Sequence, residues 1–134
     1  MARLQGDWRL RREVRHASGQ VDKLLGTCRF TRSGLQLIQE ERGTLETAQR
    51  RFEATRRYVW AETDGELQVF FEDMRPFLSI PKAVPMPQAT HFCDPDRYDV
   101  VFDFTLWPSW ETVWRVEGPR KGYVMTSHFA PDDP

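Results

Sequence analysis

One short stretch gathers most of the side chains that could bind a metal or transfer a proton. Residues 90–100, THFCDPDRYDV, contain a histidine, a cysteine, three aspartates and a tyrosine. On a strand, His91 and Cys93 would share a face, and Asp94 or Asp96 could complete a ligand set. The same His91 could act as a general acid or base. Metal binding and proton transfer are therefore the two chemistries to consider here.

A structural role explains this stretch better than a metal does. Zinc sites usually draw on two separated ligand pairs, and the remaining histidines, His16 and His128, belong to no such pair. Asp94-Pro95-Asp96 is good turn chemistry, because aspartate side chains accept backbone N–H groups and proline restricts φ. We therefore predict a corner between two strands without a metal, from which His91 reaches a cavity.

Arginine in alternation with apolar residues is the second chemical signal. Arg12 shares a strand face with Trp8, and Arg56 shares one with Trp60. An inward charge must be paired or solvated, because its desolvation costs several kcal/mol. Either the arginines form structural ion pairs, or they receive an anionic ligand such as a carboxylate or phosphate. The acidic side chains considered as structural partners are Glu40, Glu41 and Asp103.

Aromatic residues would line the same interior. The candidates for ligand contact, besides the two arginines, are Tyr58, Trp60, His91, Tyr98 and Trp114. Core packing is the commoner role for any one aromatic residue. The sequence contains no nucleophile elbow, no Gly-rich phosphate loop and no dinucleotide fingerprint. It therefore predicts no catalytic residue and no cofactor.

These side chains lie in segments where apolar and polar residues alternate with period 2, and such segments make up almost the whole chain. Roughly nine or ten short strands follow one another, about 8–12 residues apart, although residues 40–48 are ambiguous and could hold a helical turn. The pattern predicts an all-β, antiparallel up-and-down barrel of about 8–10 strands with at most a short helix. Closure would remove both sheet edges. We expect one domain over residues 1–130 and a polar tail over 131–134.

Composition restricts the partners. The 134 residues carry a formal net charge of −1, which provides no field for binding nucleic acid. No apolar run approaches the ~20 residues of a membrane helix, and the chain opens without an apolar leader. With only two cysteines, reduced thiols are the default. The sequence predicts a cytoplasmic monomer or homodimer with a small-molecule ligand and no nucleic-acid or membrane partner.

The first strand begins with the motif GDW, from Gly6 to Trp8. It resembles the G-x-W of lipocalin-like (calycin) barrels, where the tryptophan plugs the closed end and a late arginine packs across the indole. The resemblance implies structural roles for Gly6 and Trp8. In WRVEGPRK it offers Arg115 or Arg120 as the covering arginine.

The order of motifs resembles a bacterial domain-of-unknown-function family that is regarded as lipocalin-like. The matching pieces are GDWRLRR, RRYVW, FFEDMRPF, HFCDPDRYDVVFDF, WETVWRVEGPRK and GYVMTSHF. Two positions depart from that family, which usually has Asp-Gly-Arg and then Phe-His at one turn. Here the turn is Asp73-Met74-Arg75, and Leu78 stands where the histidine would be. The resemblance implies a fold and carries no activity.

Three functions follow from these features. The sequence favours an intracellular small-molecule-binding barrel whose ligand is small and anionic or aromatic. One alternative is a cyclase-like or isomerase-like barrel enzyme, with His91 as acid or base and Arg56 stabilising negative charge. Another is a haem-binding calycin, with His91 or His128 on the iron. The absence of a second catalytic group near His91 in the sequence favours binding over catalysis.

Overall fold

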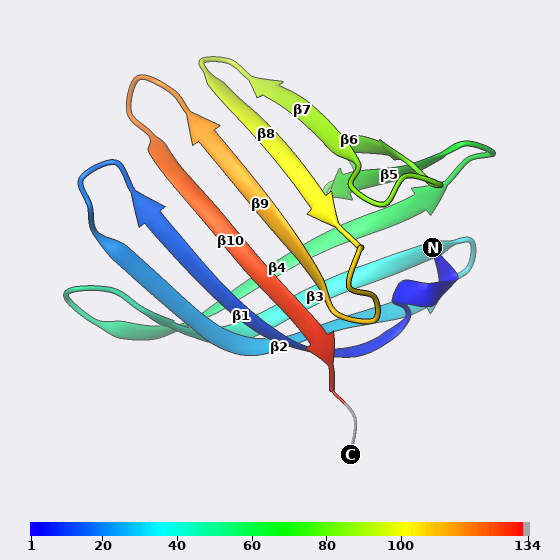
Figure 1. The fold of residues 1–134 in the computed structure, drawn as a ribbon, viewed down its shortest axis with the longest axis horizontal. Helices are drawn as coiled ribbons and strands as arrows, with labels where there is room; N and C mark the ends of the chain where they lie inside the picture. The colour runs from blue at the N-terminus through cyan, green and yellow to red at the C-terminus, as the bar shows by residue number, and fades with distance from the viewer. Residues whose placement is uncertain (133–134) are drawn as a thin grey trace.

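Ten antiparallel strands form one continuous sheet in this computed structural model, which describes residues 1–132. Each strand pairs with its neighbours in sequence, and β1 also pairs with β10, so the order is β6-β5-β4-β3-β2-β1-β10-β9-β8-β7. The two edge strands, β6 and β7, bring Cα atoms within 8 Å of one another. The sheet therefore curls into a nearly closed barrel (Figure 1). The predicted all-β up-and-down architecture is confirmed.

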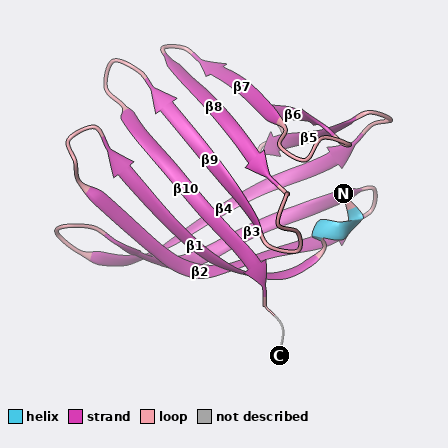
Figure 2. Ribbon diagram, in the orientation of Figure 1, coloured by secondary structure: helices cyan, strands magenta, loops and turns pink. Residues whose placement is uncertain are grey.

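Short turns join most of the elements, and the one helical segment of residues 1–132 is a 3-10 turn near the N-terminus (Figure 2). In chain order the elements are η1 (Ala2–Leu4), β1 (Gly6–His16), β2 (Val21–Ser33), β3 (Gln36–Glu46), β4 (Arg51–Glu62), β5 (Glu66–Phe71), β6 (Pro76–Pro81), β7 (Gln88–Cys93), β8 (Asp96–Asp103), β9 (Trp110–Glu117) and β10 (Gly122–Pro131).

The ambiguous segment after Gln39 is strand and not a helical turn, since β3 continues to Glu46. Gln39 and Glu41 lie on the inner face although both are polar, with exposed fractions of 7% and 5%. Polar side chains at inner positions interrupt the apolar alternation without ending the strand. A local pattern could not distinguish this arrangement from a helical turn.

Two glycines allow β2 and β3 to approach closely. Gly26 pairs with Gly43 in the ladder. A Cβ atom on Gly26 would overlap the carbonyl oxygen of Arg42, and a Cβ on Gly43 would lie 2.7 Å from the carbonyl oxygen of Leu25. Any larger residue would push the two backbones apart, as expected at a tight bend of a barrel.

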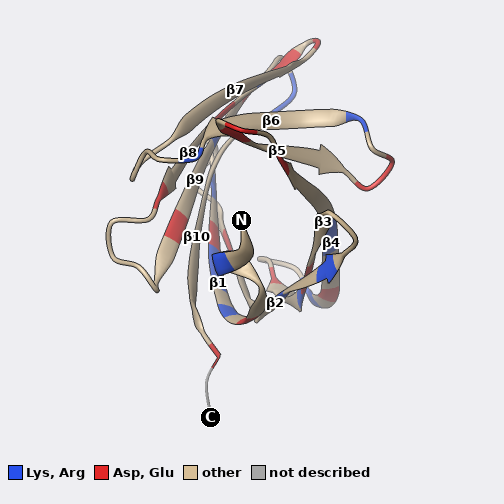
Figure 3. Ribbon diagram, turned by 90° about the vertical axis from the view of Figure 1, so that its right-hand side faces the viewer, with Lys and Arg blue, Asp and Glu red and all other residues tan. Residues whose placement is uncertain are grey.

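One end of the barrel is closed by η1 and a group of indoles. Trp8 is only 5% exposed and donates from Nε1 to the carbonyl oxygen of Leu4 at 2.8 Å. Its ring packs edge-on against Trp107 and Trp110, and Arg3 lies 4.9 Å above the ring of Trp107. In the view along the barrel (Figure 3), η1 lies across this end. The other end carries an open hollow beside the β1–β2 and β3–β4 turns.

The expectation that Arg115 or Arg120 covers Trp8 is wrong. Trp8 pairs with Pro131, the last residue of β10. Both arginines lie near the start of that strand, because Arg115 pairs with Val124 and Arg120 falls in the β9–β10 turn. Their side chains are exposed to solvent. Most of the length of β10 therefore separates them from the indole.

The start of β1 and the end of β10 lie side by side at the closed end. Gly6 starts β1 with φ of +128°, a conformation that glycine adopts most readily. Residues 131 and 132 were expected in the tail, yet Pro131 belongs to β10 and the N–H of Asp132 donates to the carbonyl oxygen of Asp7 at 3.0 Å. The rest of the predicted tail, residues 133–134, lies outside the described residues.

Candidate ligand-binding site

A buried polar network crosses the middle of the barrel. The Arg12 guanidinium donates to both carboxylate oxygens of Glu41, at 2.9 and 3.0 Å, and to the Ser127 hydroxyl at 2.7 Å. The Gln39 amide donates to Glu41 at 3.0 Å and accepts from the indole N–H of Trp60 at 2.8 Å. Since Arg12 and Glu41 are 6% and 5% exposed, each charge needs the other. Arg12 therefore forms a structural ion pair.

Arg56 faces the same interior in different surroundings. Its guanidinium lies 5.6 Å from the centroid of the Trp114 ring and donates to the Tyr58 hydroxyl at 3.3 Å. Glu41 is its cross-strand neighbour in the ladder, but that carboxylate binds Arg12. Within residues 1–132, Arg56 has no carboxylate within 4.0 Å. The side chain is solvent-exposed, which suits it to receive an anion.

The two arginines border one compartment in the open half of the barrel. Its volume is about 100 Å³, and its charged borders are Arg12, Glu41, Arg56 and Arg42, of which Arg42 is exposed on the outer face of β3. The apolar side chains around it are Val14, Leu24, Leu45 and Ala54. The sequence predicted that Arg12 and Arg56 point into one cavity with at least one of Tyr58, Trp60, Tyr98 or His91 on its wall. Both arginines border this compartment, but none of those four side chains does.

A wider hollow lies at the open rim, between the β1–β2 turn and the β3–β4 turn. Its volume is about 410 Å³, and His16, Asp22 and Phe52 are among its lining residues. The imidazole Nε2 of His16 is 2.8 Å from a carboxylate oxygen of Asp22. Each of these three residues lies two positions nearer the rim, on the same strand, than an apolar residue of the compartment: His16 follows Val14, Asp22 precedes Leu24, and Phe52 precedes Ala54. The hollow therefore lies on the rim side of the compartment, and the two have no lining residue in common.

The closed half is filled. A cavity of about 30 Å³ lies on the other side of the polar network, among Trp60, Phe102 and Trp110. This volume has room for about two or three water molecules, which need roughly 10–15 Å³ each, whereas drug-sized ligands occupy roughly 300–1,000 Å³. Trp60, predicted as a ligand contact, is 2% exposed and packs edge-on against Phe30 in this core. Its link to the buried polar network is the hydrogen bond from its indole N–H to the Gln39 side chain.

Four predicted residues come together in an aromatic cluster around Phe77. Ring centroids lie 5.2 Å from Phe77 for His91 and Trp114, and 6.0 Å for Tyr58 and Tyr98. At such separations the rings contact each other directly. The cluster therefore forms a packed part of the barrel wall. Tyr58, Phe77 and Trp114 line the 30 Å³ cavity, and none of the five rings borders the 100 Å³ compartment.

Tyrosine hydroxyls supply the neutral polar groups of this wall. Burial raises the pKa of Tyr58, against the opposing effect of the Arg56 charge, and burial also raises the pKa of Tyr123. Both phenols are therefore protonated at neutral pH. The Lys121 ammonium lies 3.4 Å from the Tyr98 hydroxyl. Tyr123 was not predicted from the sequence, although alternation with buried Met125 in the last strand was a signal for its inward position.

Residues 90–100 form a hairpin, as predicted. Cys93 pairs with Asp96 at the ends of β7 and β8, so that Asp94 and Pro95 make the turn. Over residues 1–132, no three His, Cys, Asp or Glu side chains are grouped to hold a metal ion. His91 points toward the aromatic cluster, with its ring 6.0 Å from that of Tyr98.

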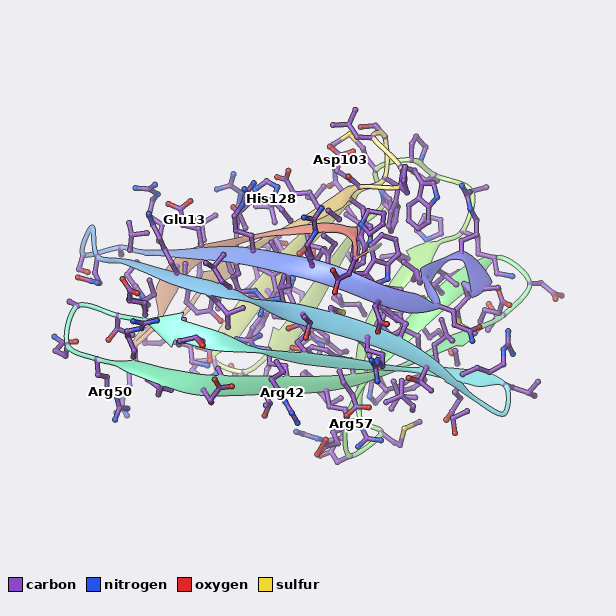
Figure 4. The ribbon with its side chains drawn as sticks, turned by 90° about the horizontal axis from the view of Figure 1, so that it is seen from below. Glu13, Arg42, Arg50, Arg57, Asp103 and His128 are labelled. Carbon is purple, nitrogen blue, oxygen red and sulfur yellow. The ribbon has the colours of Figure 1, made fainter. Side chains whose placement is uncertain are left out.

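His128 is wrong as a haem ligand inside the barrel. It lies on the outer face of β10, between inward-facing Ser127 and Phe129, which are 0% and 2% exposed. Its Nδ1 atom is 3.3 Å from a carboxylate oxygen of Glu111 on the same outer face. Figure 4 shows the side chain directed away from the interior.

A nearly closed antiparallel up-and-down barrel that is plugged at one end has the lipocalin-like fold. The chain belongs to a family of unknown function, DUF6314, whose model matches residues 4–131. The structure of the S-type phycobiliprotein lyase CPES from Guillardia theta is similar, with a TM-score of 0.71 over 99% of this chain and 90% of that chain. At 11% identity this similarity shows the fold. No curated protein matches the sequence significantly.

No helix within residues 1–132 has the length and apolar character to cross a membrane.

Proposed function

We propose that this protein is a small-molecule-binding barrel whose ligand carries a carboxylate or phosphate group that pairs with Arg56. One observation carries the proposal: the interior brings Arg12 and Arg56 together with a single nearby carboxylate, Glu41, and Arg12 takes both of its oxygens. One positive charge is left over, on a side chain in contact with solvent and with the face of Trp114. An anionic ligand would supply the missing partner.

The fold and the surroundings of Arg56 support this function. Small barrels of this kind often hold one ligand in the interior, and the similar barrel from Guillardia theta belongs to a lyase named for phycobiliproteins. The phenols of Tyr58 and Tyr123 are protonated at neutral pH, so they add hydrogen-bond donors without adding negative charge. Cytoplasmic location, a monomeric or homodimeric state and the absence of nucleic-acid or membrane partners belong to the same proposal. The free thiols of Cys28 and Cys93 support a reducing compartment.

Catalysis by His91 has less support. A catalytic histidine is normally oriented by a hydrogen bond to its second ring nitrogen. The rings around His91 are those of Phe71, Phe77 and Tyr98, and no hydrogen bond joins the imidazole to another side chain within residues 1–132. Binding is therefore the function that this geometry favours.

Thermal melts of wild type, Arg56→Met and Arg57→Met, each with a panel of carboxylates and phosphates, test the proposal. Arg57 is the matched control because it lies on the same strand and points away from the barrel (Figure 4). A ligand at about 100 times its Kd stabilises by about 2.7 kcal/mol, so wild type and Arg57→Met should melt several degrees higher with it. Arg56→Met should lose this shift while its ligand-free melting temperature stays within a few degrees of wild type.

Two results would contradict the proposal. One is the absence of any ligand-induced shift in the wild type across the panel. The other is a ligand-free Arg56→Met protein destabilised by several kcal/mol, which would mark Arg56 as a structural ion-pair member.

A further inference from the structure

The compartment beside Arg56 has apolar walls. Val14, Leu24, Leu45 and Ala54 come from four consecutive strands, β1 to β4, and together border its free volume. Leu24 is buried and the other three are half-buried. Removing apolar surface from contact with water is favourable, so an apolar group that covers these walls gains free energy. The walls therefore favour the hydrocarbon part of a ligand.

The floor of the compartment requires no polar ligand atom. All three nitrogens of Arg12 donate to protein oxygens, and both oxygens of Glu41 accept hydrogen bonds. A polar group placed against this floor would have to compete with bonds that are already made. Of the two arginines that border the compartment from the inner face, Arg12 is paired and Arg56 has no carboxylate within 4.0 Å among the described residues, so the anionic end of a ligand belongs at Arg56.

The volume sets the size of the apolar part. A cavity of about 150 Å³ lined by aliphatic and aromatic side chains holds benzene, with its six carbon atoms. At about 100 Å³, this compartment holds about four carbon atoms by the same ratio. An aromatic ring would exceed the space, whereas a short aliphatic chain would fill it.

We infer that the ligand is a short-chain aliphatic anion, a carboxylate or phosphate monoester, whose head group pairs with Arg56 and whose chain of about four carbons lies among β1 to β4. This inference rests on the proposed function and identifies its ligand class. It also decides between the anionic and aromatic ligands that the sequence left open.

Titration calorimetry with straight-chain carboxylates from acetate to octanoate, and with the matching alkyl phosphates, tests the inference. Each added methylene contributes about 0.8 kcal/mol when it is buried, or about fourfold in affinity. The affinity should rise by this factor up to a chain of about four carbons and then level off. The series that binds more tightly identifies the head group.

Two variants that change the volume locate the chain. Ala54→Ile adds carbon atoms to the compartment wall, so the levelling should move to a shorter chain. Thr44→Ile, on the outer face of the neighbouring strand β3, does not border the compartment and should leave the series unchanged. Leu45→Ala enlarges the compartment and should move the levelling to a longer chain, which provides an independent readout should Ala54→Ile fold poorly. Circular dichroism and a thermal melt check the fold of each variant.

The outcomes separate the two proposals. An affinity that is independent of chain length, or that rises steadily to octanoate, overturns the short-chain inference. The inference also fails if neither Ala54→Ile nor Leu45→Ala changes the chain length at which the affinity stops rising. If binding in such a case is still lost in Arg56→Met, the proposed function stands without the inference. Binding that is unaffected by Arg56→Met overturns both, and so does the absence of binding by any anion of either series.

Discussion

Replacing Glu41 by glutamine should destabilise the protein strongly, because it leaves the Arg12 charge buried without a counter-charge. The two side chains are 6% and 5% exposed. Two unit charges about 4 Å apart attract by about 4 kcal/mol at an effective dielectric constant of about 20. Breaking a buried pair from one side typically costs about 3–5 kcal/mol. Against a total stability of about 5–15 kcal/mol for a domain, this loss should lower the melting temperature by about 10–20 °C.

Urea unfolding followed by tryptophan fluorescence measures this loss. Glu40→Gln is the matched control, since Glu40 is exposed on the outer face of the same strand and its change should stay within about 0.5 kcal/mol. The double variant Arg12→Met, Glu41→Met should lose much less than the sum of its single changes, because it removes both charges and leaves neither unpaired. A loss below about 1 kcal/mol for Glu41→Gln, or additive losses in the double variant, would refute this account of the network.

Three further predictions concern other parts of the barrel. Met74 has φ of +70°, so Met74→Gly should stabilise by roughly 0.5–1 kcal/mol in urea unfolding, whereas Met74→Ala should not. Burial, and to a lesser extent the negative charge of Glu41, raises the pKa of the Cys28 thiol. A thiol reagent should therefore modify exposed Cys93 in the native protein and modify Cys28 only in denaturant. Equal rates of modification at the two cysteines would show that the core around Cys28 is open. Hydrogen bonds from Thr105 lower the pKa of Asp103 in the folded protein. The stability that ionised Asp103 contributes is therefore present above its ordinary pKa and is lost as the pH falls through the lowered pKa. Asp103→Asn should make the unfolding free energy less dependent on pH below about pH 4, and the same pH dependence in the variant and the wild type would contradict this account.

The strands were predictable because side chains alternate across a strand whatever the rest of the chain does. The same rule placed Trp8 on the inner face. What covers Trp8 depended on how distant segments meet: Leu4 of η1 accepts its indole hydrogen bond, and Trp107 comes from the β8–β9 loop. The resemblance pointed instead to Arg115 or Arg120, which the register of β10 places far along the barrel.

The arginines show most clearly what the sequence by itself determined. Period-2 alternation put Arg12 and Arg56 on inner faces, and the cost of burying a charge required that each be paired or solvated. Which arginine would be paired depended on tertiary structure. Glu41 stands beside Arg56 in the β3–β4 ladder, yet both of its oxygens bind Arg12, 29 residues away in sequence. Only the curvature of the closed sheet brings those two side chains together across the interior, and it is this pairing that leaves Arg56 available to a ligand.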